Sequence, residues 1–316
     1  MSELNTQQPK TQLKGVLLLL LTAIIWGTSF VAQSLGSDSV PGFTFMGIRT
    51  IIGAFFLLPF ILTRDKISAK KMTESEIQQR KATDKKTIKY GIIIGVFLCA
   101  ATNFQQFAFY QPGAGAGKIA FITAMYMFFV PILGLLFFRK KIPFITWICI
   151  ILGFIGLYFL CFETASFGSI GLCDILTFIC AIFFTLQILF IEKFAPECDG
   201  IKLSCVQFFT AGILSLILMF IFERPDLAQI KAGILPILYS GIMSCGFAYT
   251  MQVVGQKYCE ATIASLLMCM ESVFATLSAA IYLHETLSGR EITGCVVMFV
   301  AIIISQLSEK FKFFKS

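Results

Sequence analysis

Charge is scarce in this 316-residue sequence, since Asp, Glu, Lys and Arg together make up only 14% of it. Histidine is scarcer still: His284 is the single one, and no second cluster of metal ligands accompanies it. A catalytic zinc site takes about three protein ligands, so the sequence argues against a membrane metallohydrolase. The eleven cysteines contain no Cys-x-x-Cys pair, and we interpret them as small buried apolar residues.

Long apolar runs dominate the rest of the chain. Hydrophobic residues make up 57% of it and the mean hydropathy is +0.84, which excludes a water-soluble core of this size. Runs such as GVLLLLLTAII at 15–25 lack the alternation of a membrane β-barrel. A helix needs about 20 apolar residues to cross ~30 Å of hydrocarbon. We therefore predict an all-α integral membrane protein with ten transmembrane helices, at 15–35, 41–63, 90–110, 118–138, 143–162, 171–192, 201–222, 234–254, 261–283 and 291–308.

The first of these spans resembles a secretory signal peptide in one respect, because Lys10 and Lys14 precede a run of leucines. Its apolar stretch is long, however, and no convincing small-x-small cleavage site follows it. We predict that it remains in the protein as an uncleaved anchor.

Basic residues are distributed unevenly between the predicted connections. With ten spans and both termini on one side, that side carries 20 of the 25 Lys and Arg residues and the other side four, while Arg49 lies within a span. Because basic loops stay cytoplasmic, we predict a multi-pass protein of the cytoplasmic (inner) membrane with both termini cytoplasmic; an organelle membrane is the alternative. The net charge of +7 is then no sign of nucleic-acid binding.

Nine of these basic residues lie in the connection 64–89. We interpret them as topology determinants on a solvated linker. Binding of anionic lipid by this segment is the alternative.

The last five spans repeat the first five. Span 4 aligns with span 9 at a shift of 145 residues, which places Tyr126 on Glu271. Spans 1 and 2 align with spans 6 and 7 at a shift of 158 residues, which places Arg49 on Gln207. An odd number of spans inverts the second copy in the membrane, and inverted repeats are typical of carriers with a site near the midplane. The predicted organisation is an N-terminal tail 1–14, five-helix repeats at 15–162 and 171–308, and a C-terminal tail 309–316.

Several motifs resemble the EamA-type branch of the drug/metabolite transporter superfamily. They are AIIWGTSF at 23–30, Arg49, the run ASLLMCMESVF at 264–274, Gly171 with Asp174, and LHETL at 283–287. The resemblance covers about residues 15 to 308. It implies ten helices in two tandem five-helix domains, a central cavity, and export or uptake of amino acids and small metabolites.

Two positions depart from that family. It usually has proline after the Glu of span 9 and after the aligned residue of span 4, where this chain has Ser272 and Met127. We expect the helix kinks to be absent there, or moved to Pro131.

Two charged residues lie within the predicted spans. Glu271 is near the middle of span 9, where a charged group costs about 2.5–3.5 kcal/mol on insertion scales. We expect it to face the protein interior and to titrate a proton or bind a substrate ammonium, with a hydrogen bond between helices as the alternative. Arg49 could hold a substrate carboxylate, but we favour outward snorkelling or capping of carbonyl groups, because it aligns with neutral Gln207.

Three predicted spans carry polar residues at helical spacing. These are Trp26, Ser29 and Gln33, then Asn103, Gln106 and Tyr110, then Tyr249, Gln252 and Gln256. Amides that face lipid lack partners, so these faces should turn inward; hydrogen bonding between helices explains them equally well. With Tyr126 and Gln187 they predict an aromatic, amide-lined cavity that suits an apolar or aromatic side chain. The candidate cavity residues are Trp26, Ser29, Arg49, Asn103, Gln106, Tyr126, Gln187, Tyr249, Gln252 and Glu271.

The glycine-rich segment 113–118 does not match a phosphate-binding loop, since Pro112 stands at the first glycine position and Ile119 at that of the Ser or Thr. We predict a tight turn there, and no cofactor. The leading functional hypothesis is a secondary carrier of a small metabolite, such as an amino acid, which exports it by alternating access. A channel-like facilitator is the alternative, and a membrane-embedded enzyme a weaker one. The expected partners are the small-molecule substrate and membrane lipid but no nucleic acid, and a monomer is compatible with the sequence.

Overall fold

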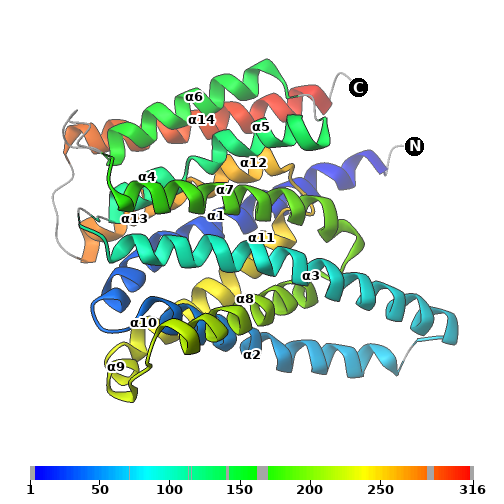
Figure 1. Cartoon of the computed structure of the whole chain (residues 1–316). Coiled ribbons are helices and arrows are strands. Elements are labelled where there is room, and N and C mark those ends of the chain that lie inside the picture. Colours follow the sequence, from blue (N-terminus) through cyan, green and yellow to red (C-terminus); the bar gives the residue numbers. More distant parts are fainter. Residues whose placement is uncertain are drawn as a thin grey trace.

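A computed structural model describes residues 4–70, 72–112, 114, 116–139, 142–161, 170–282 and 288–313. The predicted all-α fold is confirmed, because the elements in these ranges are all helices (Figure 1). In the same ranges, nine helices are long and apolar enough to cross a membrane, and Phe144–Leu160 is a shorter apolar helix. The predicted sites at His284, at Gly113 and in the motif 283–287 lie outside the described residues.

The helices follow the predicted spans in order. The first half contains α1 (Leu4–Ser37), α2 (Gly42–Ala69), α3 (Glu74–Phe109), α4 (Ala116–Thr123), α5 (Tyr126–Phe138) and α6 (Phe144–Cys161). The second half contains α7 (Leu172–Phe194), the 3₁₀ turn η1 (Ala195–Glu197), α8 (Gly200–Phe222), α9 (Leu227–Ala232), α10 (Ile234–Tyr239), the π-helix η2 (Ser240–Tyr249), α11 (Thr250–Gly255), α12 (Ala261–Met268), α13 (Met270–Tyr282) and α14 (Gly289–Phe313).

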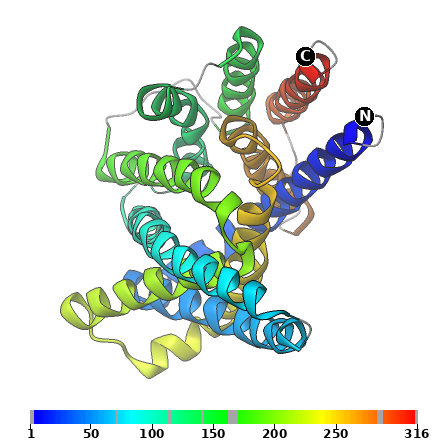
Figure 2. The same ribbon diagram turned by 90° about the vertical axis from the view of Figure 1, so that its right-hand side faces the viewer.

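The two most extensive helix contacts are antiparallel pairs, and each pair takes one helix from either half. Helix α2 packs along α8, with Gly47 against Leu216 and Gly212 against Ile51, and α6 packs along α14. These pairs are spans 2 and 7 and spans 5 and 10 of the repeat. In Figure 2, α6 and α14 lie side by side at the edge of the bundle. Helix α1 begins and α14 ends at the end of the bundle where α2 ends and α3 begins, as ten crossings require (Figure 1).

Glycine allows the closest approach between the two halves. A Cβ added at Gly294 would lie 2.6 Å from the carbonyl oxygen of Gly156, and one at Gly53 would lie 2.4 Å from Cβ of Cys245. No side chain fits at such distances without movement of the backbone. Gly53 and Gly156 therefore lie at close helix contacts that a larger residue would disrupt.

The segment 64–89, which we predicted to be a solvated linker, has mostly exposed side chains, and almost all of it is helical. Helix α2 continues to Ala69, and α3 begins at Glu74 after an N-cap at Thr73. The carboxylate of Glu76 accepts hydrogen bonds from the backbone N of Thr73 at 2.7 Å and from its hydroxyl at 2.9 Å. This capping starts the helix in a charged stretch that hydropathy alone does not mark as part of a span.

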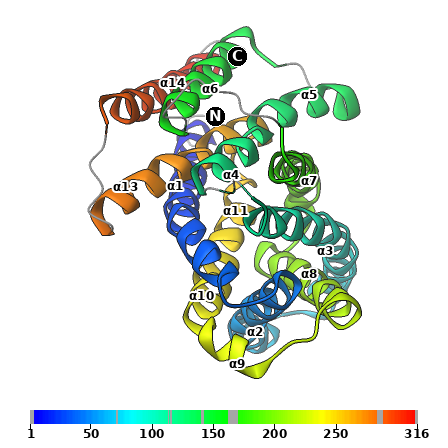
Figure 3. The same cartoon turned by 60° about the vertical axis from the view of Figure 1, so that its left-hand side comes forward.

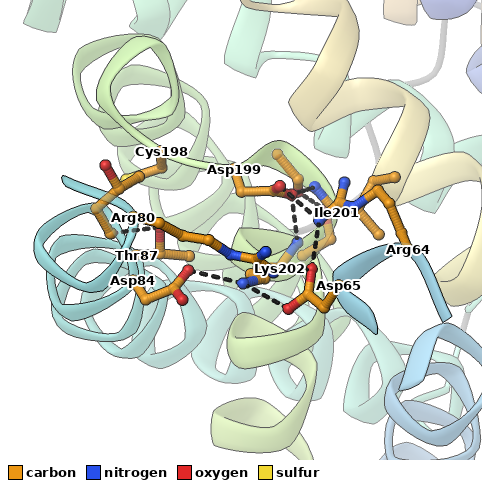
Figure 4. Close-up of polar contacts among 12 residues, drawn as sticks. Arg64, Asp65, Arg80, Asp84, Thr87, Cys198, Asp199, Ile201 and Lys202 are labelled. Atoms are coloured by element: carbon orange, nitrogen blue, oxygen red, sulfur yellow. Dashed lines mark hydrogen bonds and ion pairs between the residues drawn. The ribbon is translucent and has the colours of Figure 1, made fainter. Parts of the chain in front are cut away.

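The ends of α2 and α3 form a cluster of ion pairs with the start of α8 (Figure 4). Nζ of Lys202, on α8, lies 2.8 Å from both Asp65 of α2 and Asp84 of α3. Asp65 also pairs with Arg80. Two further pairs join the same elements, Arg64 with Asp199 at 2.5 Å and Lys86 with Glu197 at 2.6 Å. Charged residues of the first half thus bind the second half at this end of the bundle.

Spans 4 and 9 are broken, although both lack the proline of the family. The break between α4 and α5 falls at Ala124 and Met125, and that between α12 and α13 falls at Cys269. Our expectation that the kinks are absent or moved to Pro131 is therefore wrong, since α5 continues through Pro131. Tighter i→i−3 bonds close the breaks, with the backbone N of Met127 on the carbonyl of Ala124 at 3.0 Å.

Candidate substrate cavity

The two halves enclose a narrow cavity near the breaks in α4/α5 and α12/α13 (Figure 3 shows α1, α4, α7, α11 and α13 around this region). The volume of the cavity is about 30 Å³. Seven of the ten predicted residues line it: Trp26, Ser29, Arg49, Tyr126, Tyr249, Gln252 and Glu271. The other lining residues are Phe30, Gln33, Gln105, Thr123, Phe184, Ile188 and Ser244.

Glu271 owes its position to the break in span 9. The break places it in the first turn of α13, and the positive end of a helix dipole favours a negative charge. Its side chain is buried, with 3% exposed. The hydroxyl of Tyr126, the first residue of α5, donates a hydrogen bond to its Oε1 at 3.3 Å. The two broken helices therefore meet at this carboxylate.

Arg49 lines the same cavity from α2. Its side chain is only 1% exposed, so it does not snorkel outward, one of the two structural roles that we considered. Its Nε and Nη1 atoms have no hydrogen-bond partner among the described residues, so these two donors cap no carbonyl group there either. The guanidinium carbon lies 5.8 Å from the centre of the Phe45 ring, within the range of a cation–π contact.

Two aromatic residues form one wall of the cavity. The rings of Trp26, on α1, and Tyr249, at the end of η2, lie 4.6 Å apart and are tilted by 59°. The hydroxyl of Thr22 donates to the carbonyl of Ala248 at 3.0 Å, which fixes α1 against η2. The indole N–H of Trp26 is buried and has no acceptor in the part of the chain that the structure describes.

Three of the predicted residues do not line the cavity, and each bonds to another part of the protein. Asn103 donates to the hydroxyl of Ser215, on α8, at 2.8 Å. Gln106 donates to the carbonyl of Gln33 at 3.4 Å. Gln187 and Gln252 donate to each other, at 3.4 and 3.1 Å, so Gln187 supports a lining residue from behind.

Some of the residues that we missed carried a signal in the sequence. Phe184 and Ile188 are the repeat counterparts of Trp26 and Phe30 at the shift of 158 residues, and all four line the cavity. The alignment of the halves would have found them. Gln105 carried no such signal, because its helical neighbours left open which face of α3 turns inward.

Comparison with known proteins gives a consistent result. The family model described as "EamA-like transporter family" matches residues 13–162 and 171–307. An uncharacterized transporter of Archaeoglobus fulgidus is 27% identical over 290 residues, which cover 92% of this chain and 84% of the relative. One of Clostridium kluyveri is 26% identical, with 94% of each chain covered. A crystal structure of a protein with 16% sequence identity shares the fold, with a TM-score of 0.73 over 93% of this chain and 96% of that one.

Proposed function

Because this chain belongs to the EamA-like transporter family, we propose that it is a secondary carrier that exports a small amphipathic metabolite, such as an amino acid, by alternating access. The observation that carries this proposal is the cavity between the two halves. It is lined from both repeats, and it contains a buried carboxylate, a buried guanidinium and an aromatic wall. The cytoplasmic membrane, with both termini inside, is part of the proposal.

The size of the cavity supports a carrier whose helices must separate to admit substrate. A water molecule needs roughly 10–15 Å³ of such volume, so 30 Å³ holds about two waters and no amino acid. Three of the lining residues, Tyr126, Tyr249 and Glu271, lie at the breaks in α4/α5 and α12/α13 or at the end of the π-helix. Interrupted helices at a central site are a recurring feature of carriers, because the ends of the half-helices present backbone groups and dipoles to substrate and coupling ions.

We assign Glu271 the role of a proton-titrating group or of the contact for a substrate ammonium. A carboxylate that is buried at this depth needs either a proton or a cation. The hydrogen bond from Tyr126 is a single neutral donor, and it leaves the charge of the carboxylate unbalanced.

The test begins with a search for the substrate. Cells that overproduce the protein are screened for resistance or sensitivity to toxic amino-acid and metabolite analogues, and compounds that score are tested in proteoliposomes. A carrier gives saturable flux and counterflow of labelled substrate. Flux that rises linearly with concentration, with no exchange, would replace the carrier by a channel-like facilitator.

A further inference from the structure

Three buried hydrogen-bond donors and one buried acceptor, Oε1 of Gln33, line the cavity without a partner among the described residues, so donors are in excess. Nε and Nη1 of Arg49 and the indole N–H of Trp26 are all buried, line the cavity and have no acceptor in the described part of the chain. Both side chains are at least nine-tenths buried, with 1% and 9% exposed. Buried donors are nearly always paired, so three unpaired donors beside one cavity need a specific explanation.

The charge of Arg49 is also unbalanced. Guanidinium groups remain protonated in proteins, so this charge cannot be removed by loss of a proton. Among the described residues, the only carboxylate that lines the cavity is Glu271, which accepts a hydrogen bond from Tyr126, and no ion pair joins Arg49 to an acid. The free acceptor at the cavity, Oε1 of Gln33, is neutral and cannot balance the charge of Arg49. The described part of the protein therefore leaves the guanidinium without a paired anion.

The repeat shows that this feature belongs to one half only. Gln207 is the counterpart of Arg49 at the shift of 158 residues; it is fully buried, but it is neutral and does not line the cavity. A positive group on one side of the approximate two-fold axis fixes the direction in which an asymmetric ligand binds.

From these observations we infer that Arg49 and Trp26 form an anion subsite that binds the carboxylate of the transported compound. This inference rests on the proposed carrier function and specifies its substrate class: compounds with a carboxylate next to an apolar or aromatic body. The guanidinium and the indole N–H supply directed donors, and a carboxylate presents two acceptor oxygens to them. Glu271 lines the same cavity and is then available to the amino group of a zwitterion.

The test uses the full-length protein in lipid nanodiscs with Trp147→Phe, which leaves Trp26 as the only tryptophan and its fluorescence as the reporter of binding. The probes are two matched pairs: L-phenylalanine with L-phenylalaninamide, and 3-phenylpropionate with phenethylamine. We expect the carboxylate of each pair to bind about 10- to 100-fold more tightly, the ratio typical of a hydrogen bond to a charged group. Arg49→Gln should bring each pair to within about three-fold, and Arg49→Lys should retain part of the preference.

Arg224→Gln is the matched control, because it removes an exposed guanidinium that does not line the cavity, and it should leave all four affinities unchanged. Equal binding within each pair, an unchanged preference in Arg49→Gln, or no binding of either carboxylate would overturn the subsite. If Arg49→Gln does not fold, the two pairs still decide the question in the protein with an intact Arg49.

Counterflow of the same probes in proteoliposomes separates the two proposals. Carboxylate-selective binding without flux of any compound would reject the carrier and retain the subsite. Flux that does not require a carboxylate would reject the subsite and retain the carrier.

Discussion

The Tyr126 hydroxyl donates to the Glu271 carboxylate at 3.3 Å, and the two residues are repeat counterparts, 145 positions apart. Cys269 and Ala124 have the same separation, and the Cys269 thiol donates to the Ala124 carbonyl at 3.6 Å. Counterparts in two inverted copies can touch only beside the axis that relates the copies. That axis therefore passes next to the carboxylate, and the cavity surrounds it.

Neutralising this carboxylate should stop transport without unfolding the protein. Gln at position 271 still accepts a hydrogen bond from Tyr126, but it neither titrates nor balances a cation. We expect Glu271→Gln to abolish flux in proteoliposomes or to remove its pH dependence. Glu197→Gln is the control, since Glu197 is half-exposed and pairs with Lys86 away from the cavity. An unchanged rate and pH profile in Glu271→Gln would exclude Glu271 from the mechanism.

The crossing of α6 and α14 should not tolerate a side chain. Gly294→Ala places a Cβ 2.6 Å from a carbonyl oxygen, and the resulting overpacking should lower the free energy of unfolding by about 1–3 kcal/mol. Gly289, at the start of the same helix, has nothing within 4 Å of its Cβ position, so Gly289→Ala is the matched control and should change stability little. Thermal or SDS-induced unfolding measures both variants, and equal stability of the two would contradict the close contact.

The ion cluster in Figure 4 should contribute to stability in a salt-dependent way. Lys202→Met leaves Asp65 and Asp84 without their shared cation, and we expect a loss of about 1–2 kcal/mol. High salt should stabilise the variant relative to the native protein, because it screens the repulsion between the two acids. Lys86→Met, at a pair with both side chains half-exposed, should lower stability less than Lys202→Met does, because solvent screens an exposed pair. A larger loss in Lys86→Met than in Lys202→Met would refute this ranking.

The proposed orientation can be mapped with introduced thiols. Lys70, the C-cap of α2, and Lys231, in α9, are both exposed, and the end of α2 and α9 lie at opposite ends of the bundle (Figure 1). We expect a membrane-impermeant thiol reagent applied to intact cells to label Lys231→Cys and to label Lys70→Cys only after the membrane is opened. The described native cysteines are buried or half-buried and should give a low background. The reverse pattern would invert the proposed topology.

The sequence sufficed for the number and order of the helices, because crossing hydrocarbon demands long apolar runs. It did not suffice for the helix starts and helix breaks, because hydropathy does not indicate them. Helix α3 starts at Glu74 rather than near residue 90, since the capping at Thr73 extends the helix through charged residues. The breaks at Ala124 and Cys269 contain no proline. Backbone hydrogen bonds stabilise them, and no residue pattern in the sequence predicts these bonds.

Prediction of the cavity met a related limit on α3. This helix carries amides at positions 103, 105 and 106, and consecutive positions differ by about 100° around a helix. Asn103 faces Ser215 on α8 and Gln105 lines the cavity with Thr123, yet both are buried. A buried amide needs a hydrogen-bond partner, but another helix or the substrate can provide it. The spacing of the amides therefore could not show which face of α3 lines the cavity.

The pairs α2–α8 and α6–α14 each consist of one helix from either half. The helices of the two halves are therefore interleaved and do not form two separately packed domains. A chain that stopped at Cys161 would present the buried amides and Arg49 to lipid and would lack both partner helices. We therefore expect that neither half is stable in a bilayer without the other.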